Sequence, residues 1–244
     1  MNKTIINKIL ITLAFLFAYR VLAYITIPGV DLVVIKDFFD TNQSNALGLF
    51  NMFSGNAVER LSIISLGIMP YITASIVMEL LAATFPALGK MKKERDGMQK
   101  YMQIIRYVTI FITVIQAISV SFGLRSIGGG SNGAILIDMS EFLVISVFCM
   151  LTGTMLLMWI GEQITQRGVG NGISLIIFGG IVSGIPSAVA ATFKLVNTGE
   201  INILSLIFIA VIIIATICCI VYIELAERRI PISYARKVIM QNSY

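Results

Sequence analysis

Long apolar runs dominate the chain and recur six times along its 244 residues. Each run approaches or exceeds the roughly 20 residues that an α-helix needs to cross about 30 Å of hydrocarbon. This pattern predicts an all-α fold, a polytopic membrane helix bundle. The first run follows basic residues like a signal peptide, but it continues past Arg20 without a convincing small-residue cleavage site, which favours a retained helix. The predicted spans lie near residues 9–27, 69–88, 104–124, 142–161, 172–193 and 202–224.

The connection between the first two runs, residues 28–67, contains a further predicted helix around residues 51–65. Ser54 or Asn56 is suited to cap it, and Glu59 follows Asn56 by three residues, as a capping box requires. About ten helical residues span only about 15 Å, too short to cross a membrane. Two placements remain open: a re-entrant half-helix, which implies a cavity around it, or an amphipathic helix on the external surface.

The stretch from Trp159 to Ser174 is a polar, glycine-punctuated turn between two apolar runs. One membrane helix is expected to end near Gly161 and the next to begin near Asn171. Either Asn171 or Ser174 is suited to cap the second helix. Three glycines are expected to permit a tight reversal with positive φ, namely Gly168, Gly170 and Gly172.

Composition places the chain in a membrane and disfavours catalysis. Hydrophobic residues make up 57% and charged residues 13%, whereas soluble domains carry about 25% charged residues. Histidine is absent, which removes Ser-His-Asp and Cys-His catalysis and most zinc or haem ligation. The cysteines Cys149, Cys218 and Cys219 lie inside apolar runs, without metal-ligand spacing. We therefore expect no enzyme activity, no cofactor and no metal.

Basic residues predict the orientation, because cytoplasmic loops are enriched in Lys and Arg. Thirteen of them fall on one predicted side and four on the other, which makes the N-terminus, the 89–103 loop and the C-terminal tail cytoplasmic. The net charge of +5 therefore reflects topology more than nucleic-acid binding. The thirteen are Lys3, Lys8, Lys90, Lys92, Lys93, Arg95, Lys100, Arg106, Arg167, Arg228, Arg229, Arg236 and Lys237, and the four are Lys36, Arg60, Arg125 and Lys194.

Two charged residues fall inside predicted spans. Glu79 is the one acid well inside an apolar run, so it is either a proton-relay group or a packing residue. Packing is favoured, since no partner acid or base is visible in the other spans. Arg20, near the outer end of the first run, is expected to reach the interface or to pair with an acid. From these patterns alone a channel, a secondary transporter and a structural subunit all remain open.

Several sequence blocks, in family order along the whole chain, resemble the SecY family of protein-conducting channels. They are residues 27–31, 50–55, 66–76, 92–94, 152–155, 159–174 and 227–236. That family has ten membrane helices in two inverted five-helix halves. The resemblance implies a SecY-like inverted-repeat channel, with residues 1–196 as its N-terminal half and 197–244 as the sixth helix and the start of a cytoplasmic loop. The C-terminal half is absent, so the chain is expected to be a fragment that is unstable or inactive without it.

The resemblance implies the central pore subunit of a bacterial inner-membrane translocon, which conducts unfolded secretory polypeptides and releases membrane segments laterally into lipid. Expected partners are SecE, SecG, the SecA motor, the ribosome, signal-sequence-bearing polypeptides and membrane lipid. The motor energy comes from partners. A secondary transporter is the main rival, but it usually needs intramembrane charges, and only Glu79 qualifies. Many relatives have an uncharged glutamine in place of Glu79.

The resemblance also assigns site residues. Ile68, Ile72, Ile173 and Ile177 become half of an apolar pore ring, although spacing alone would make them ordinary packing contacts. A plug over about residues 52–66 includes Ser54, Asn56, Glu59, Arg60, Ser62 and Ser65. The loop between helices four and five contains Arg167, Gly168, Gly170, Asn171 and Gly172. Cytoplasmic docking falls to Arg228, Arg229, Tyr234, Arg236 and Lys237, with the basic 90–106 segment as a weaker candidate.

Overall fold

A computed structural model of the chain describes residues 2–41, 51, 54–127, 133–197 and 203–226. Its helices confirm the predicted all-α fold, and the described residues contain only two isolated β-bridges and no strand. Five helices are long and apolar enough to cross a membrane, and a bent pair brings the total to six. The helices are α1 (Asn2–Leu22), α2 (Leu32–Thr41), α4 (Met69–Thr84), α5 (Pro86–Lys93), α6 (Arg95–Ser126), α7 (Met139–Arg167), α8 (Gly172–Asn197) and α9 (Ile203–Glu224).

Helix α1 ends at Leu22, so the prediction that it continues to residue 27 is wrong. The chain beyond it is extended instead. Ile27 donates its N–H to the carbonyl of Leu61 at 2.9 Å, and Ile63 donates to the carbonyl of Ile25 at 2.9 Å. Proline at position 28 favours an extended backbone at Ile27. The apolar residues after Leu22 therefore pair with a distant segment rather than extending the helix.

The second predicted span is broken at a proline. Helix α4 ends at Thr84, and α5 leaves it at an angle of 111°. Proline 86 occupies the first turn of α5, where its missing N–H leaves no hydrogen bond unmade. Helix α6 then begins at Arg95, so most of the expected 89–103 loop is helical.

Helix α2, a short helix after the first span, was not among the predicted elements. Ile35 and Phe39, four residues apart, are buried on one face, while Lys36 and Asp37 are exposed. The Asp31 carboxylate accepts the N–H of Val33 at 2.9 Å at the start of the helix. The four-residue spacing of Ile35 and Phe39, together with Asp31 before the helix, is the sequence signal that predicts α2.

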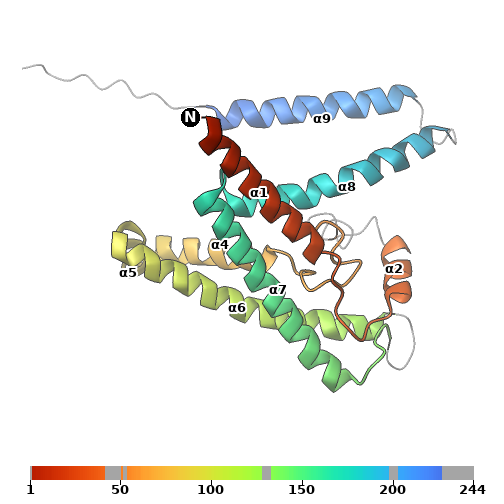
Figure 1. The fold of residues 1–244 in the computed structure, drawn as a ribbon, viewed down its shortest axis with the longest axis horizontal. Coiled ribbons are helices and arrows are strands. Elements are labelled where there is room, and N and C mark those ends of the chain that lie inside the picture. Colours follow the sequence, from red (N-terminus) through yellow and green to blue (C-terminus); the bar gives the residue numbers. More distant parts are fainter. Residues whose placement is uncertain (1, 42–50, 52–53, 128–132, 198–202, 227–244) are drawn as a thin grey trace, which may run out of the picture. The chain divides into compact units, whose positions relative to one another are not determined.

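Helices α6 and α7 pack together, and α4 and α5 pack on α6 (Figure 1). The hydroxyls of Ser121 and Ser146 lie 2.6 Å apart across the α6–α7 contact. Thr109 and Thr113 are fully buried in α6, yet each hydroxyl donates to the backbone carbonyl four residues earlier. Buried polar groups in this interface are thus hydrogen-bonded, as an apolar interior demands.

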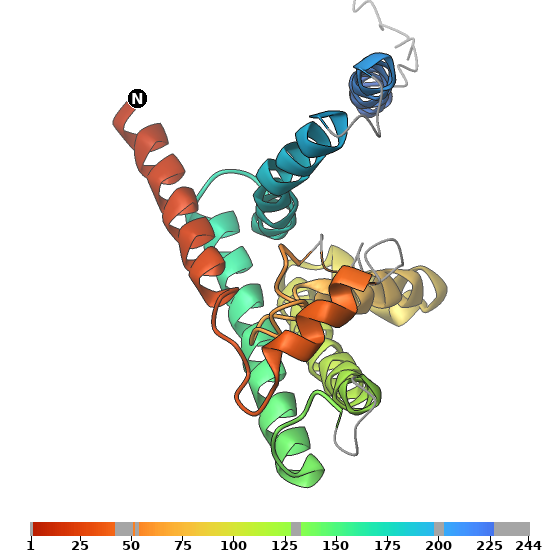
Figure 2. The same ribbon diagram turned by 90° about the vertical axis from the view of Figure 1, so that its right-hand side faces the viewer.

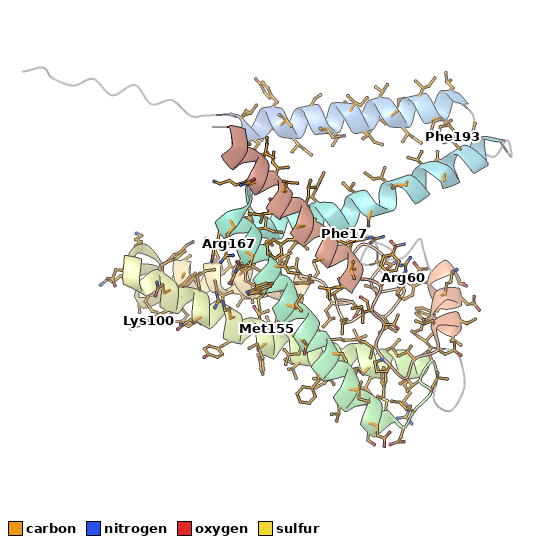
Figure 3. The ribbon with its side chains drawn as sticks, in the orientation of Figure 1. Phe17, Arg60, Lys100, Met155, Arg167 and Phe193 are labelled. Atoms are coloured by element: carbon orange, nitrogen blue, oxygen red, sulfur yellow. The ribbon has the colours of Figure 1, made fainter. Side chains whose placement is uncertain are left out.

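Helix α1 lies beside α7, as Figures 1 and 2 show. An apolar recess of about 940 Å³ lies between them, with Phe17 of α1 and Met155 of α7 in its lining (Figure 3). Phe15 and Trp159 meet edge to face across the same contact, with ring centroids 5.9 Å apart. These contacts fix the helix that carries Tyr19 and Arg20, two residues of the site.

The chain divides into two compact units, residues 1–188 and 189–244. The first unit holds α1 to α7 and most of α8. In the second unit, α9 is apolar along its length, and its side chains are exposed almost throughout. The predicted span 202–224 agrees with α9 to within one residue at its start.

Candidate functional site

The segment from residue 54 to residue 68, called here the turn segment, covers most of the predicted plug. It is a series of turns, so the predicted short helix is wrong in either of its placements. Asn56 and Leu61 have φ values of 65° and 42°, in the left-handed region that interrupts a right-handed helix. The capping box is also absent. The Glu59 carboxylate instead accepts from the side-chain amides of Asn51 and Asn56, at 3.1 and 3.4 Å.

The second part of the turn segment is pinned to the bundle through its backbone. Residues 61–63 form the two hydrogen bonds with residues 25–27 described above. Gly153 of α7 packs directly on Ile63, and a Cβ added to that glycine would lie 2.6 Å from the Ile63 carbonyl carbon. Leu61 and Ile64 are buried. The turn segment is therefore seated inside the first unit rather than lying on its surface.

The first part of the turn segment is held by side chains of α1. Tyr19 donates its hydroxyl to the carbonyl of Ser54 at 3.2 Å, and Arg20 Nη1 donates to the carbonyl of Gly55 at 2.7 Å. Arg20 was expected to reach the interface or to pair with an acid. It instead forms a hydrogen bond with the turn segment. Figure 3 shows the neighbouring Arg60 close to the end of α1.

Arg60 and Arg20 both lie against Tyr24, just beyond the end of α1. Their guanidinium carbons are 4.1 and 5.3 Å from the centre of the Tyr24 ring. Hydrogen bonding from Arg60, together with the charges of both arginines, lowers the pKa of the Tyr24 phenol. Two cations on one aromatic ring tie the turn segment to α1.

The four predicted ring isoleucines gather where α4, α8 and the turn segment meet. Ile68, Ile72 and Ile177 line a recess of about 180 Å³, together with Ser54 and Ser65. Ile173 belongs to the same apolar cluster, one helical turn before Ile177. The structure therefore brings all four together, and their role in a pore stays a prediction.

Two serines of the turn segment have buried hydroxyls. Within the described part of the chain, Ser62 Oγ and Ser65 Oγ have no hydrogen-bond partner. Ser62 is fully buried, and Ser65 borders the recess. Unpaired buried hydroxyls weaken a packed state, so this part of the segment is less stable than its apolar contacts alone would make it.

Helix α7 continues to Arg167, so the expected end near Gly161 is wrong by more than one turn. Gly161 instead faces the beginning of α8, where Ile173 and Ile176 pack on it. The Thr165 hydroxyl accepts the N–H of Gly172 at 2.9 Å. The last turns of α7 and the first turn of α8 therefore form a close helix–helix contact.

The loop between α7 and α8 needs a left-handed backbone at one glycine only. Gly170 has φ +72°, whereas Gly168 has φ −98° and Gly172 is helical. The Asn171 side chain accepts the N–H of Ile173 at 3.0 Å, which confirms Asn171 as a cap of α8. Thr12 of α1 accepts the N–H of Val169 at 3.1 Å and ties the loop to the first helix.

Glu79 has a basic partner that the sequence analysis did not foresee. Lys92 of α5 donates to the Glu79 carboxylate across the bend after α4, and both side chains are exposed. Arg106 likewise binds Glu162 of α7, through Nε at 3.1 Å and Nη2 at 2.7 Å. Two cations of the basic 90–106 segment are thus engaged in ion pairs.

Replacing Glu79 by glutamine is expected to leave the thermal midpoint of unfolding close to that of the parent. An exposed ion pair contributes little, because solvent screens the charges and ordering two long side chains costs entropy. Thermal unfolding in detergent measures the effect. A marked loss of stability would show that the pair holds α5 against α4.

The remaining site predictions lie elsewhere. The five docking residues at 228–237 are outside the described residues. No group of three or more acidic or cysteine side chains suited to a metal ion occurs in the portion that the structure describes.

Comparison with known proteins decides the family. A SecY family profile matches residues 62–244. The protein translocase subunit SecY of Helicobacter pylori is 79% identical over 242 residues, which is 99% of this chain. The chain belongs to the SecY family. It spans only 58% of the length of that SecY relative, however. The SecY subunit of Escherichia coli K12 is 40% identical over 232 residues, covering 95% of this chain and 52% of its own length.

Solved channel structures share the SecY fold of this chain. Sec61 in a canine ribosome-channel complex from the endoplasmic reticulum matches with a TM-score of 0.62 at 20% identity, covering 94% of this chain and 50% of Sec61. A structure described as a protein conducting channel matches with a TM-score of 0.53 at 18% identity, over 74% of this chain and 37% of that one. At these identities the likeness concerns the fold alone. The shared fold agrees with the membrane-length helices of this chain, which is a multi-pass membrane protein.

Proposed function

We propose that this chain forms one half of the pore of a protein translocase, the path by which unfolded secretory polypeptides cross a membrane. One observation carries the proposal. One apolar cluster holds Ile72 of α4, Ile173 and Ile177 of α8, and Ile68 at the end of the turn segment, and all of them except Ile173 line the recess beside that segment. A narrow apolar constriction resists ions because it sheds water and charges enter it at high cost.

The part of the turn segment up to Leu66 then serves as the plug of the resting pore. It is packed between α1, α7 and the ring isoleucines rather than exposed as a free loop. Displacement of the plug by an entering polypeptide opens the path, and helix α4 forms one wall of a lateral exit to lipid.

Partners complete the translocase. Nothing in the sequence resembles a nucleotide-binding motif, so the motor energy comes from outside, from SecA or the ribosome. Both are expected to dock on the basic residues at 228–237, with SecE and SecG as companion subunits. A bacterial inner membrane is proposed from the likeness to bacterial relatives, and the excess of basic residues on one side supports a cytoplasmic N-terminus.

The ionisable groups of the membrane helices support a channel over a coupled transporter. Glu79, the acid that a transporter would use for ion coupling, is exposed and paired with Lys92. A buried acid facing a central cavity would be expected of a proton relay.

A translocation assay tests the function. The chain is joined to the part of the Helicobacter pylori relative that lies outside the alignment, and this chimera is reconstituted in vesicles with SecE, SecG and SecA. With ATP, we expect it to protect a signal-bearing preprotein from added protease, and not the same preprotein without its signal sequence. The parent Helicobacter pylori subunit is the positive control. If the parent protects the preprotein and the folded chimera does not, the proposal is wrong.

A further inference from the structure

We infer that the C-terminal end of α1 is a latch for the plug, and that Arg20 is the residue that positions the plug tip. The tip is defined as residues 54–60 and the base as residues 61–63. The inference rests on the proposed function, because it concerns how the resting pore is kept closed. It divides the plug into a part that moves and a part that stays.

The tip and the base are held by different kinds of contact. Backbone hydrogen bonds to residues 25–27 hold the base, and the Gly153 contact with Ile63 leaves it no room to shift toward α7. Among the described residues, the long-range hydrogen bonds of the tip come from two α1 side chains, Tyr19 and Arg20. Its backbone bonds with the base are local ones within the turns, from Leu61 to Val58 and from Ser62 to Ala57. Side-chain contacts can be released one at a time, whereas the paired backbone of the base opens as a unit. The tip is therefore the moving part.

The tip also has the backbone of a hinged element. Gly55 and Asn56 have φ values of 68° and 65°, and Leu61 at the start of the base has φ 42°. These left-handed positions bracket the tip at both ends. Rotation at such positions moves the intervening turn without unwinding a helix.

Arg20 is the strongest of the tip contacts. Its bond to the Gly55 carbonyl is charge-assisted and short at 2.7 Å. The guanidinium also lies over Tyr24, whose ring contacts Arg60 from the tip. One arginine thus binds the tip directly and through the aromatic ring.

Gly55 lies at the point where α1, the tip and α8 converge. A Cβ added at Gly55 would lie 3.1 Å from Gly180 Cα, 3.2 Å from Ser183 Oγ and 3.2 Å from Arg20 Nη1. The tip is therefore clasped between Arg20 and α8, the helix that carries two of the ring isoleucines. Separation of α8 from α1 would release the tip and widen the ring together.

Thiol labelling in the assembled chimera tests the latch. The native cysteines Cys149, Cys218 and Cys219 are changed to serine, and Ser54→Cys supplies a reporter at a position that is 8% exposed. A membrane-impermeant maleimide is added to resting vesicles without preprotein. Labelling then measures how often the tip leaves its seat. Ala57→Cys, at a fully buried tip position, is a second reporter.

Arg20→Met is expected to raise the labelling rate roughly ten- to a hundredfold, the effect of losing one hydrogen bond to a charged group. Arg20→Lys keeps a cationic donor and is expected to restore most of the protection. Arg125→Met removes an exposed arginine of α6 and serves as the control for loss of charge. It is expected to label at the parent rate.

The outcomes separate the latch from the proposed function. If both reporters label at the parent rate in the Arg20→Met variant, the latch is wrong, whatever the result of the translocation assay. Equal acceleration by Arg20→Met and Arg20→Lys also overturns it, because a structural disturbance would not be rescued by the conservative change. Failure of the translocation assay with accelerated labelling would leave the latch standing and reject the channel.

Discussion

Resting ion conductance of the assembled chimera is expected to rise roughly tenfold or more when Ile68, Ile72, Ile173 and Ile177 are all changed to glycine. Ile68, Ile72 and Ile177 line the recess beside the turn segment, and Ile173 belongs to the same apolar cluster. Removing them widens the constriction and lets water remain in it, so ions no longer face a dewetted gap. Single-channel recording in planar bilayers, without preprotein, measures the change.

A matched control distinguishes the ring from general helix weakening. Glycine lowers helix stability by about 1 kcal/mol at each interior position, wherever it is placed. Changing Ile76, Val77, Val182 and Ile185 to glycine puts the same number of glycines into α4 and α8, at exposed positions. We expect this variant to keep the parent conductance. Equal conductance of the two variants would return the four isoleucines to ordinary packing.

The membrane helices could be predicted from sequence because their determinant is local. A run of about 20 apolar residues must be helical in lipid, where every backbone polar group has to be satisfied within the segment. Span 202–224 therefore coincides with α9 almost residue for residue. Span 9–27 was misplaced at its end because apolar residues 25–27 satisfy their backbone on residues 61–63.

The turn segment could not be predicted, because its conformation depends on residues far away in the chain. Asn56 and Glu59 have the spacing of a capping box. The Glu59 carboxylate instead accepts hydrogen bonds from the side chains of Asn51 and Asn56, and the backbone at Asn56 is left-handed. The bond from Arg20 to Gly55 spans 35 residues. Helical spacing contains no information about such partners.

The candidate ring shows a different limit of sequence reasoning. Residues four apart on a membrane helix share a face, but lipid, a neighbouring helix and a pore all favour isoleucine there. Resemblance to the SecY family singled out Ile68, Ile72, Ile173 and Ile177, and the structure brings the four together beside the turn segment. The partner of Glu79 was missed for another reason. Lys92 lies beyond the helix break at Pro86, and the predicted span 69–88 ran through that break as one continuous helix.

Gly172→Ala is expected to destabilise the chain by about 2–3 kcal/mol, the cost of overpacking a site that cannot relax. The added methyl would overlap the carbonyl oxygen of Gly161 and lie 2.8 Å from Ile164 Cβ. Backbone atoms occupy the space, so α7 and α8 must separate. Thermal unfolding in detergent measures the loss, and resting conductance should rise as well, because Ile173 is the next residue.

Two further alanines on the same helix pair make the steric cause testable. At Gly161 a Cβ would meet Ile173 and Ile176 side-chain atoms at 3.2 and 3.4 Å, which can shift, and at Gly184 it would meet nothing within 4 Å. Helix propensity alone predicts a gain of about 1 kcal/mol at the interior positions 161 and 184, and no loss at Gly172, the first residue of α8. Packing predicts an order instead: a loss at Gly172, a small change at Gly161 and a gain at Gly184. If all three variants melt above the parent, the close contact between α7 and α8 is refuted, and with it the account of how Ile173 and Ile177 are positioned at the recess.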